Sequence, residues 1–220
     1  MTWLAVDTSQ LQAAVCLLDG ANVVAGHTGS VDVAHSEGLL PHVDSLLRKA
    51  SIRLDQLDGF AAGVGPGSFT GIRIGCATIK ALAQVLGKPV VAFSSLRATA
   101  LSLEAADDVV AIVNAYQGQV FAGWTDEAGT WREDALTADA WAGEHGRSVS
   151  ERRFCGNGAK PFWKAFEGLP GARLTDLVHV TPDGIARAVK DGKRLTYREL
   201  SANYLRPSQA EAKLASALAK

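Results

Sequence analysis

Residues 65–75 read GPGSFTGIRIG. The apolar run Phe60–Val64 precedes them, and apolar residues at helical spacing over Ile72–Leu86 follow, up to Gly87. A short apolar run that passes through a glycine-rich turn into a helix is typical of a buried strand in an α/β fold. This segment therefore predicts a strand, a tight turn and a helix in direct succession.

The glycine-rich loop is compatible with two roles. Gly65 and Gly67 permit positive φ and a close backbone approach, and the first N–H groups of the next helix attract anions. The loop lacks the lysine of a Walker motif and the glycine spacing of a dinucleotide site. The alternative is a purely structural turn, after which Gly71 and Gly75 allow close packing against another helix.

The segments around this loop predict two similar α/β lobes. Apolar runs at 3–6, 13–18 and 23–26 are separated by turn residues, which indicates an antiparallel meander. A helix is expected over Leu39–Ala50, a strand over 90–93 and a short helix over 96–103. The same order recurs less clearly from Val109, including a helix at 184–190 with Thr181 as its N-cap. We expect two ribonuclease-H-like lobes of the actin-like ATPase (ASKHA) superfamily, residues 1–106 and 107–220, with the last residues packing back on the first lobe.

Composition limits the classes of function. The 22 basic and 23 acidic residues nearly cancel, and residues 1–100 are equally balanced with 7 of each. Binding to nucleic acid alone is therefore disfavoured, because phosphate contacts require a basic surplus. Cys16, Cys76 and Cys155 show no metal-site or disulfide spacing. The sequence shows no secretory signal and no membrane span, so we expect a cytoplasmic protein.

Few residues of the sequence indicate a catalytic or metal-binding site. Asp7-Thr8-Ser9 follows the first strand and could contact a magnesium-bound water or phosphate, but from these three residues alone we favour a turn held by its own side chains. His35 lacks a second ligand four residues on, where Leu39 stands, so we reject a metal site. Asn114 occupies in the second lobe the place of Asp7, and we interpret it as structural. Acidic residues dilute the basic stretch Arg187, Lys190, Lys193, Arg194 and Arg198, which predicts a solvated helix end; contact with RNA within a larger assembly is its alternative.

The motif GPGSFTGIRIG together with LAVDTS at residues 4–9 resembles the TsaB family, also called YeaZ. HSEGLLPHVDSLL, GCATIKALA, GKPVVAFSSL and YLRP extend the resemblance, densely over the first 100 residues. The resemblance implies a subunit that is not catalytic alone and that dimerises with a TsaD-like catalytic subunit. With a TsaE-like ATPase these proteins place threonylcarbamoyl on the adenosine beside the tRNA anticodon.

The resemblance also implies where partners bind. The interface would lie on the first two helices, and the same surface would allow self-association; the residues are Leu39, Leu40, Val43, Leu47, Arg73 and Lys80. It leaves open whether ATP or ADP binds at that interface, and tRNA is expected to bind only within the complex. Members often have Asp where Asn114 and Asn157 stand here, which weakens metal–nucleotide chemistry.

Two other functions remain as alternatives. An actin-like phosphotransferase would bind ATP between the lobes through Asp7, Thr8, Ser9, Gly65, Gly67 and Ser68. A metallo-glycopeptidase would need metal ligands that this sequence lacks.

Overall fold

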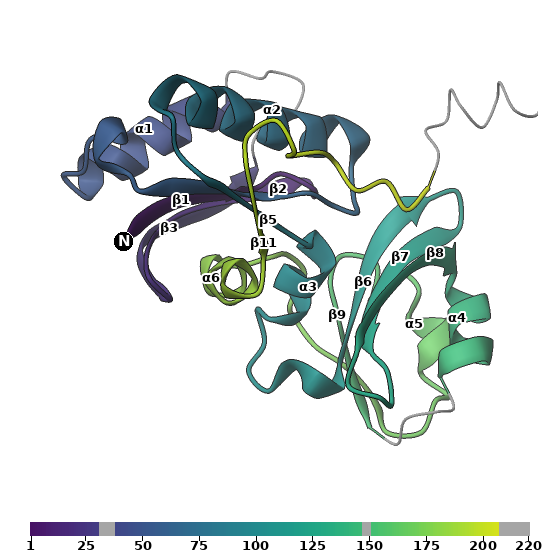
Figure 1. The fold of residues 1–220 in the computed structure, drawn as a ribbon. Helices are drawn as coiled ribbons and strands as arrows, with labels where there is room; N and C mark the ends of the chain where they lie inside the picture. Colours follow the sequence, from purple (N-terminus) through teal and green to yellow (C-terminus); the bar gives the residue numbers. More distant parts are fainter. Residues whose placement is uncertain (31–37, 147–150, 207–220) are drawn as a thin grey trace, which may run out of the picture.

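The computed structural model describes residues 1–30, 38–146 and 151–206, which form two sheets side by side (Figure 1). The first sheet has six strands in the order β11-β5-β4-β1-β2-β3. The second has five, in the order β10-β9-β6-β7-β8. This confirms the predicted α/β class with two lobes.

The first sheet begins with the predicted meander. β1 pairs antiparallel with β2, with Leu4 opposite Leu17, and β2 pairs antiparallel with β3. On the other side of β1, β4 and β5 run parallel to it, because helices connect these strands, and the edge strand β11 runs antiparallel to β5. The strands are β1 (Thr2–Asp7), β2 (Gln12–Asp19), β3 (Asn22–Ser30), β4 (Gly59–Gly63), β5 (Val90–Phe93) and β11 (Lys193–Leu195).

Helices cover both faces of the first sheet (Figure 1). On one face lie α1 (Leu39–Lys49) and α2 (Phe69–Leu86), whose apolar sides form a core with β1, β2 and β4. The other face carries α3 (Ser95–Ala100) and α6 (Pro182–Lys190). α2 begins three residues before the predicted start because the Ser68 hydroxyl caps it, and it ends at Gly87, which has a positive φ of 64°.

The second sheet repeats the meander and one crossover. Its strands are β6 (Val109–Tyr116), β7 (Gln119–Thr125), β8 (Trp131–Thr137), β9 (Arg152–Cys155) and β10 (Ala172–Leu174). α4 (Ala138–His145) and α5 (Trp163–Phe166) cover its outer face around the fully buried Trp141. Its inner face packs on Leu96 and Ala100 of α3, so that helix contributes to the core between the two sheets.

The C-terminal part of the described chain returns to the first sheet. β11 pairs with β5 at the sheet edge, and α6 packs beneath β1, β2 and β3. The sequence predicted α6 and its Thr181 cap but grouped the helix with the second lobe, which is wrong. The proposed boundary at 106/107 falls in the segment that leads from α3 to β6 and stays a prediction.

Candidate functional site

The turn after β1 lies directly against the glycine-rich loop. The Thr8 hydroxyl donates to the Gly71 carbonyl oxygen at 2.7 Å, and the Ser68 N–H donates to the Ser9 carbonyl oxygen at 2.7 Å. A Cβ on Gly71 would lie 1.9 Å from the Thr8 carbonyl oxygen, and one on Gly75 would lie 2.3 Å from the Thr8 hydroxyl. Both glycines therefore allow α2 to approach this turn, and the expected packing against another helix is wrong.

The remaining glycines of the loop also pack against other parts of the chain. Gly67, with φ 159°, would place a Cβ 2.3 Å from the Ser9 carbonyl oxygen. Gly65, with a positive φ of 99°, would meet the Ile72 side chain. The loop glycines thus have structural roles, and the Ser68 hydroxyl accepts from the Gly71 N–H at the start of α2.

Asp7 is fully buried beneath this turn. Its Oδ1 accepts from the Ser9 N–H at 2.9 Å and from the Ser9 hydroxyl at 2.6 Å, while Oδ2 has no hydrogen-bond partner. Burial raises the pKa of the carboxyl, and the nearby Ser9 and Ser95 hydroxyls partly oppose this rise. A carboxyl without solvent access cannot hold a hydrated cation in this conformation, so the geometry favours the turn-forming role of Asp7.

A small cleft separates the ends of β1 and β6, where the phosphotransferase alternative would place its nucleotide. Its volume is about 90 Å³, and it is lined by Ser9, Gln10, Leu11, Ser68, Val113, Asn114, Tyr116 and Asn157. Ligand pockets for drug-sized molecules are about 300–1,000 Å³. Of the six residues named for nucleotide binding, Ser9 and Ser68 reach this cleft, whereas Asp7, Thr8, Gly65 and Gly67 do not line it. None of its lining residues is charged.

The two asparagines that line the cleft form hydrogen bonds with the backbone around it. Asn157 Oδ1 accepts from the Asn114 N–H at 2.9 Å, and Asn114 Oδ1 accepts from the Tyr116 N–H at 2.8 Å. A carboxylate oxygen could accept the same hydrogen bonds. Compared with aspartates at these two positions, the asparagines preserve the local turns and leave the cleft with two fewer negative charges.

The predicted interface residues divide between two environments. Leu39, Val43 and Leu47 are buried in the core of the first sheet, so they present no side-chain surface to a partner here. These three residues were named from the family resemblance, and in this structure they lie on the apolar face of α1 that packs toward the chain's own core. Leu40 is exposed, and on α2 Arg73 is exposed and Lys80 is half-buried.

The outward side of α2 is a stripe of mostly small residues. Thr70, Arg73, Ala77, Ala81 and Gln84 follow each other at helical spacing and are exposed. No acidic residue occurs in this helix. At its start, Phe69 stacks on Tyr204 with ring centroids 4.7 Å apart, and Arg73 Nε donates to the Tyr204 hydroxyl at 2.9 Å.

Contrary to the expected absence of a membrane-length segment, α2 is long and apolar enough to cross a bilayer, and it is the one such helix among the described residues. A core helix of a soluble protein passes the same test, so this is weak evidence for a membrane. Only 33% of the helix is buried inside the molecule. Ile74, Leu82 and Leu86 of the helix are partly buried and pack against the core of the first sheet, whereas the large apolar side chain of Val85 is exposed.

Other candidate groups are engaged in structure. All three cysteines are buried and free, and burial raises the pKa of Cys76 to about 11 and that of Cys155 to about 12. No cluster of metal-binding side chains occurs in the described ranges, and His35 lies outside them. In the basic stretch, Arg187 binds backbone carbonyls and Arg194 lies 5.9 Å from the Trp3 ring centroid.

Comparisons with known proteins agree with this geometry. The family model described as TsaD, tRNA N6-adenosine threonylcarbamoyltransferase, matches residues 30–160, more than half of the chain. The tRNA threonylcarbamoyladenosine biosynthesis proteins TsaB of Haemophilus influenzae and Bacillus subtilis are each 36% identical to it, over 129 and 124 residues. The chain belongs to the TsaB (YeaZ) family. The matches cover 55% and 56% of this chain and about half of each TsaB relative, 52% and 54%.

Solved structures place the TsaB-family fold in its wider class. The YeaZ structure from Pseudomonas aeruginosa aligns with a TM-score of 0.76 and 26% identity, over 93% of this chain and 99% of that one. Component A of (R)-2-hydroxyglutaryl-CoA dehydratase from Acidaminococcus fermentans shares only the fold, with a TM-score of 0.51 at 12% identity over 91% and 99% of the two chains. The predicted actin-like class is thus confirmed.

Proposed function

We propose that this chain is a non-catalytic subunit required for threonylcarbamoyladenosine formation in tRNA. Membership of the TsaB family supports the pathway, since the relatives are named for it. The absence of a metal cluster in the described ranges, the buried Asp7 and the small uncharged cleft support a role other than catalysis. Localisation in the cytoplasm stays a prediction.

The observation that carries the proposal is the outward stripe of α2, defined by Thr70, Arg73, Ala77, Ala81 and Gln84. Small side chains such as Ala77 and Ala81 allow another helix to approach to an axial distance of about 8–10 Å. A long apolar helix of which a third of the residues are exposed and a further third are only partly buried is expected to gain a partner. We propose that this stripe, with Leu40 of α1, packs on the matching helices of a TsaD-like subunit.

Binding between purified proteins tests the proposed surface. Ala77→Arg and Ala81→Arg place long charged side chains in the middle of the stripe, where both alanines are exposed and the fold should tolerate them. Size-exclusion chromatography with the TsaD-like protein of the same cell should show a complex with the parent chain and none with the double variant. Glu144→Arg on α4 is the control, and it should bind normally. Equal binding by all variants would exclude this surface.

The same surface is proposed to mediate self-association of the isolated chain, and a TsaE-like ATPase is proposed to join the assembled pair. We further propose that tRNA binds only to the complex, because the net charge of -1 offers no surplus for phosphate. The phosphotransferase alternative predicts turnover of Mg-ATP by the chain alone. Calorimetry that shows tight binding with turnover would favour it.

A further inference from the structure

The two lobes are joined by two segments. The chain leaves α3 through residues 101–108 to reach β6, and it returns through residues 175–181 from β10 to α6. Any rotation of one sheet against the other must change the backbone dihedral angles of both segments. How firmly these residues are held therefore decides whether the lobes can move.

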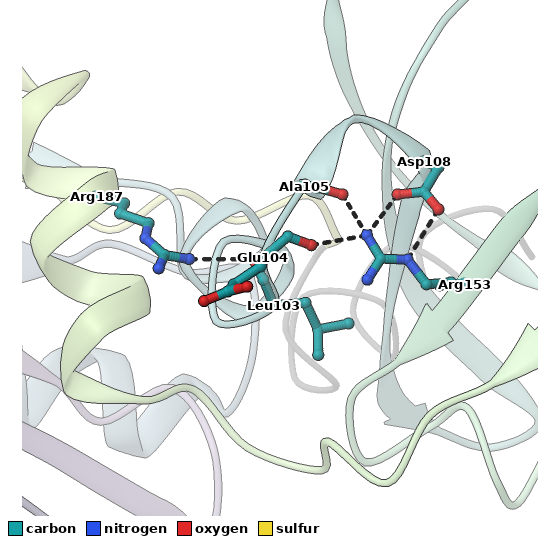
Figure 2. Close-up of polar contacts among 6 residues, drawn as sticks. All are labelled: Leu103, Glu104, Ala105, Asp108, Arg153 and Arg187. Atoms are coloured by element: carbon teal, nitrogen blue, oxygen red, sulfur yellow. Dashed lines mark hydrogen bonds and ion pairs between the residues drawn. The ribbon is translucent and has the colours of Figure 1, made fainter.

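Two arginines bind the first segment from opposite sides (Figure 2). Arg187 of α6 donates from Nη1 to the Leu101 and Leu103 carbonyl oxygens, at 2.8 and 3.1 Å. Arg153 of β9 donates from Nη2 to the Glu104 carbonyl oxygen at 2.8 Å and also to that of Ala105. Four carbonyl groups of an irregular segment are thus bound by guanidinium groups.

Arg153 also forms an ion pair at the end of this segment. Its Nε lies 2.8 Å from Asp108 Oδ2, and its Nη2 lies 2.6 Å from Asp108 Oδ1, a bidentate geometry that fixes orientation as well as distance. The same guanidinium thus binds both the middle of the segment and its last residue. Bending between Ala105 and Asp108 would break at least one of these contacts.

The two segments are also tied to each other. The Thr181 N–H donates to the Ser102 hydroxyl at 2.9 Å, and that hydroxyl donates to the Ala98 carbonyl oxygen of α3 at 2.9 Å. α6 reaches this point because Gly184 has no side chain; a Cβ there would lie 2.1 Å from the Ser102 hydroxyl. The buried Leu96 and Ala100 of α3 contact the inner face of the second sheet just beyond.

We propose that Arg153 and Arg187 lock the segment 101–108, so that the two lobes move as one rigid body and the cleft stays closed. This inference goes beyond the proposed function and does not depend on it. A working hinge in this segment would need these carbonyl groups free to reorient. Here, opening of the cleft between the lobes would leave some of these carbonyl oxygens, or one of the two arginines, without its hydrogen-bond partners.

The distance between spin labels on the two lobes tests the lock. Val24→Cys on β3 and Glu144→Cys on α4 are exposed positions outside the α2 stripe, while the native cysteines are buried. Pulsed electron–electron double resonance should give one narrow distribution of distances between the two spin labels, and Mg-ATP should not change it. Arg153→Gln with Arg187→Gln should broaden it, while Arg132→Gln, which removes an ion pair with Asp126 inside the second lobe, should not.

Three results would overturn the proposal. They are a broad or two-peaked distribution in the parent chain, an unchanged narrow distribution in the double variant, or equal broadening by Arg132→Gln. Because Arg187 binds only backbone carbonyls in this segment, Arg187→Gln alone should retain the fold and still broaden the distribution. Circular dichroism melting of each variant separates loosening of the segment from global unfolding.

Discussion

The contact between the Thr8 turn and α2 gives a sharp prediction for two glycines of one helix. In Gly71→Ala, the new Cβ would lie 1.9 Å from a backbone oxygen, and in Gly75→Ala it would lie 2.3 Å from the Thr8 hydroxyl. Overpacking of a tight site costs about 1–3 kcal/mol. Since a backbone atom cannot rotate away, we expect about 3 kcal/mol for Gly71→Ala and about 1–2 kcal/mol for Gly75→Ala.

A second substitution distinguishes these two clashes. Thr8→Ala removes the hydroxyl that Gly75→Ala would strike but leaves the carbonyl that Gly71→Ala would strike. In double-mutant cycles, Thr8→Ala should therefore recover much of the loss in Gly75→Ala and little of the loss in Gly71→Ala. Thr8→Ala alone also loses the hydrogen bond to the Gly71 carbonyl oxygen. The cycle subtracts that common cost.

Thermal and urea unfolding provide the measurement. For a chain of this size, 1 kcal/mol corresponds to about 2–4 °C in Tm. Gly143→Ala is the control, because a Cβ there meets nothing within 4 Å and alanine favours a helix by about 1 kcal/mol. A Gly71→Ala protein as stable as the parent, or one rescued fully by Thr8→Ala, would refute the close approach of turn and helix.

Three further predictions concern Asp7, Asn157 and the three cysteines. Asp7→Asn should stabilise the protein at pH 7, because a carboxyl whose pKa is raised by burial disfavours folding above its ordinary pKa of 3.8. In urea unfolding, the gain in the free energy of unfolding should shrink as the pH falls toward 3.8. A gain that grows in acid would contradict this. Asn157→Asp should keep the Asn114 contact and unfold like the parent, whereas Asn157→Leu should lose about 1–3 kcal/mol; equal losses would contradict the acceptor role. Native protein at pH 8 should react with no equivalent of a thiol reagent at Cys16, Cys76 or Cys155 until urea unfolds it, and rapid labelling would disprove their burial.

The sequence predicted those parts of the fold that local chemistry determines. The three apolar runs with turns between them form β1–β3, and Thr181 caps α6 as predicted. The cap at Ser68 was not predicted, so α2 begins three residues before its expected start. β11 was missed because Lys193 and Arg194 give an edge strand no apolar pattern. The sheet that α6 covers was also wrongly predicted, since amphipathic spacing shows that one face is buried but not against what.

The candidate surface was harder to predict than the fold. The family resemblance selected Leu39, Val43 and Leu47, which the chain buries itself, whereas the outward Ala77 and Ala81 are small and carry no pattern of their own. The glycine-rich loop indicated a close backbone approach, but the predicted partner, an anion or another helix, was not the turn at Thr8 and Ser9 that the structure shows. Its partner, the Thr8–Ser9 turn, lies more than 60 residues away in the sequence, and only the folded chain brings them together.

The central claim is that the α2 stripe serves threonylcarbamoyladenosine formation through a partner, and one cellular measurement tests it most directly. Cells depleted of the native protein are complemented with the parent chain, with Ala77→Arg/Ala81→Arg, or with Glu144→Arg, and the modified nucleoside in digested tRNA is quantified by mass spectrometry. We predict normal levels with the parent and the Glu144→Arg control, and a loss of at least about tenfold with the double variant at equal protein abundance. Normal modification in depleted cells, or full complementation by the double variant, would contradict the claim.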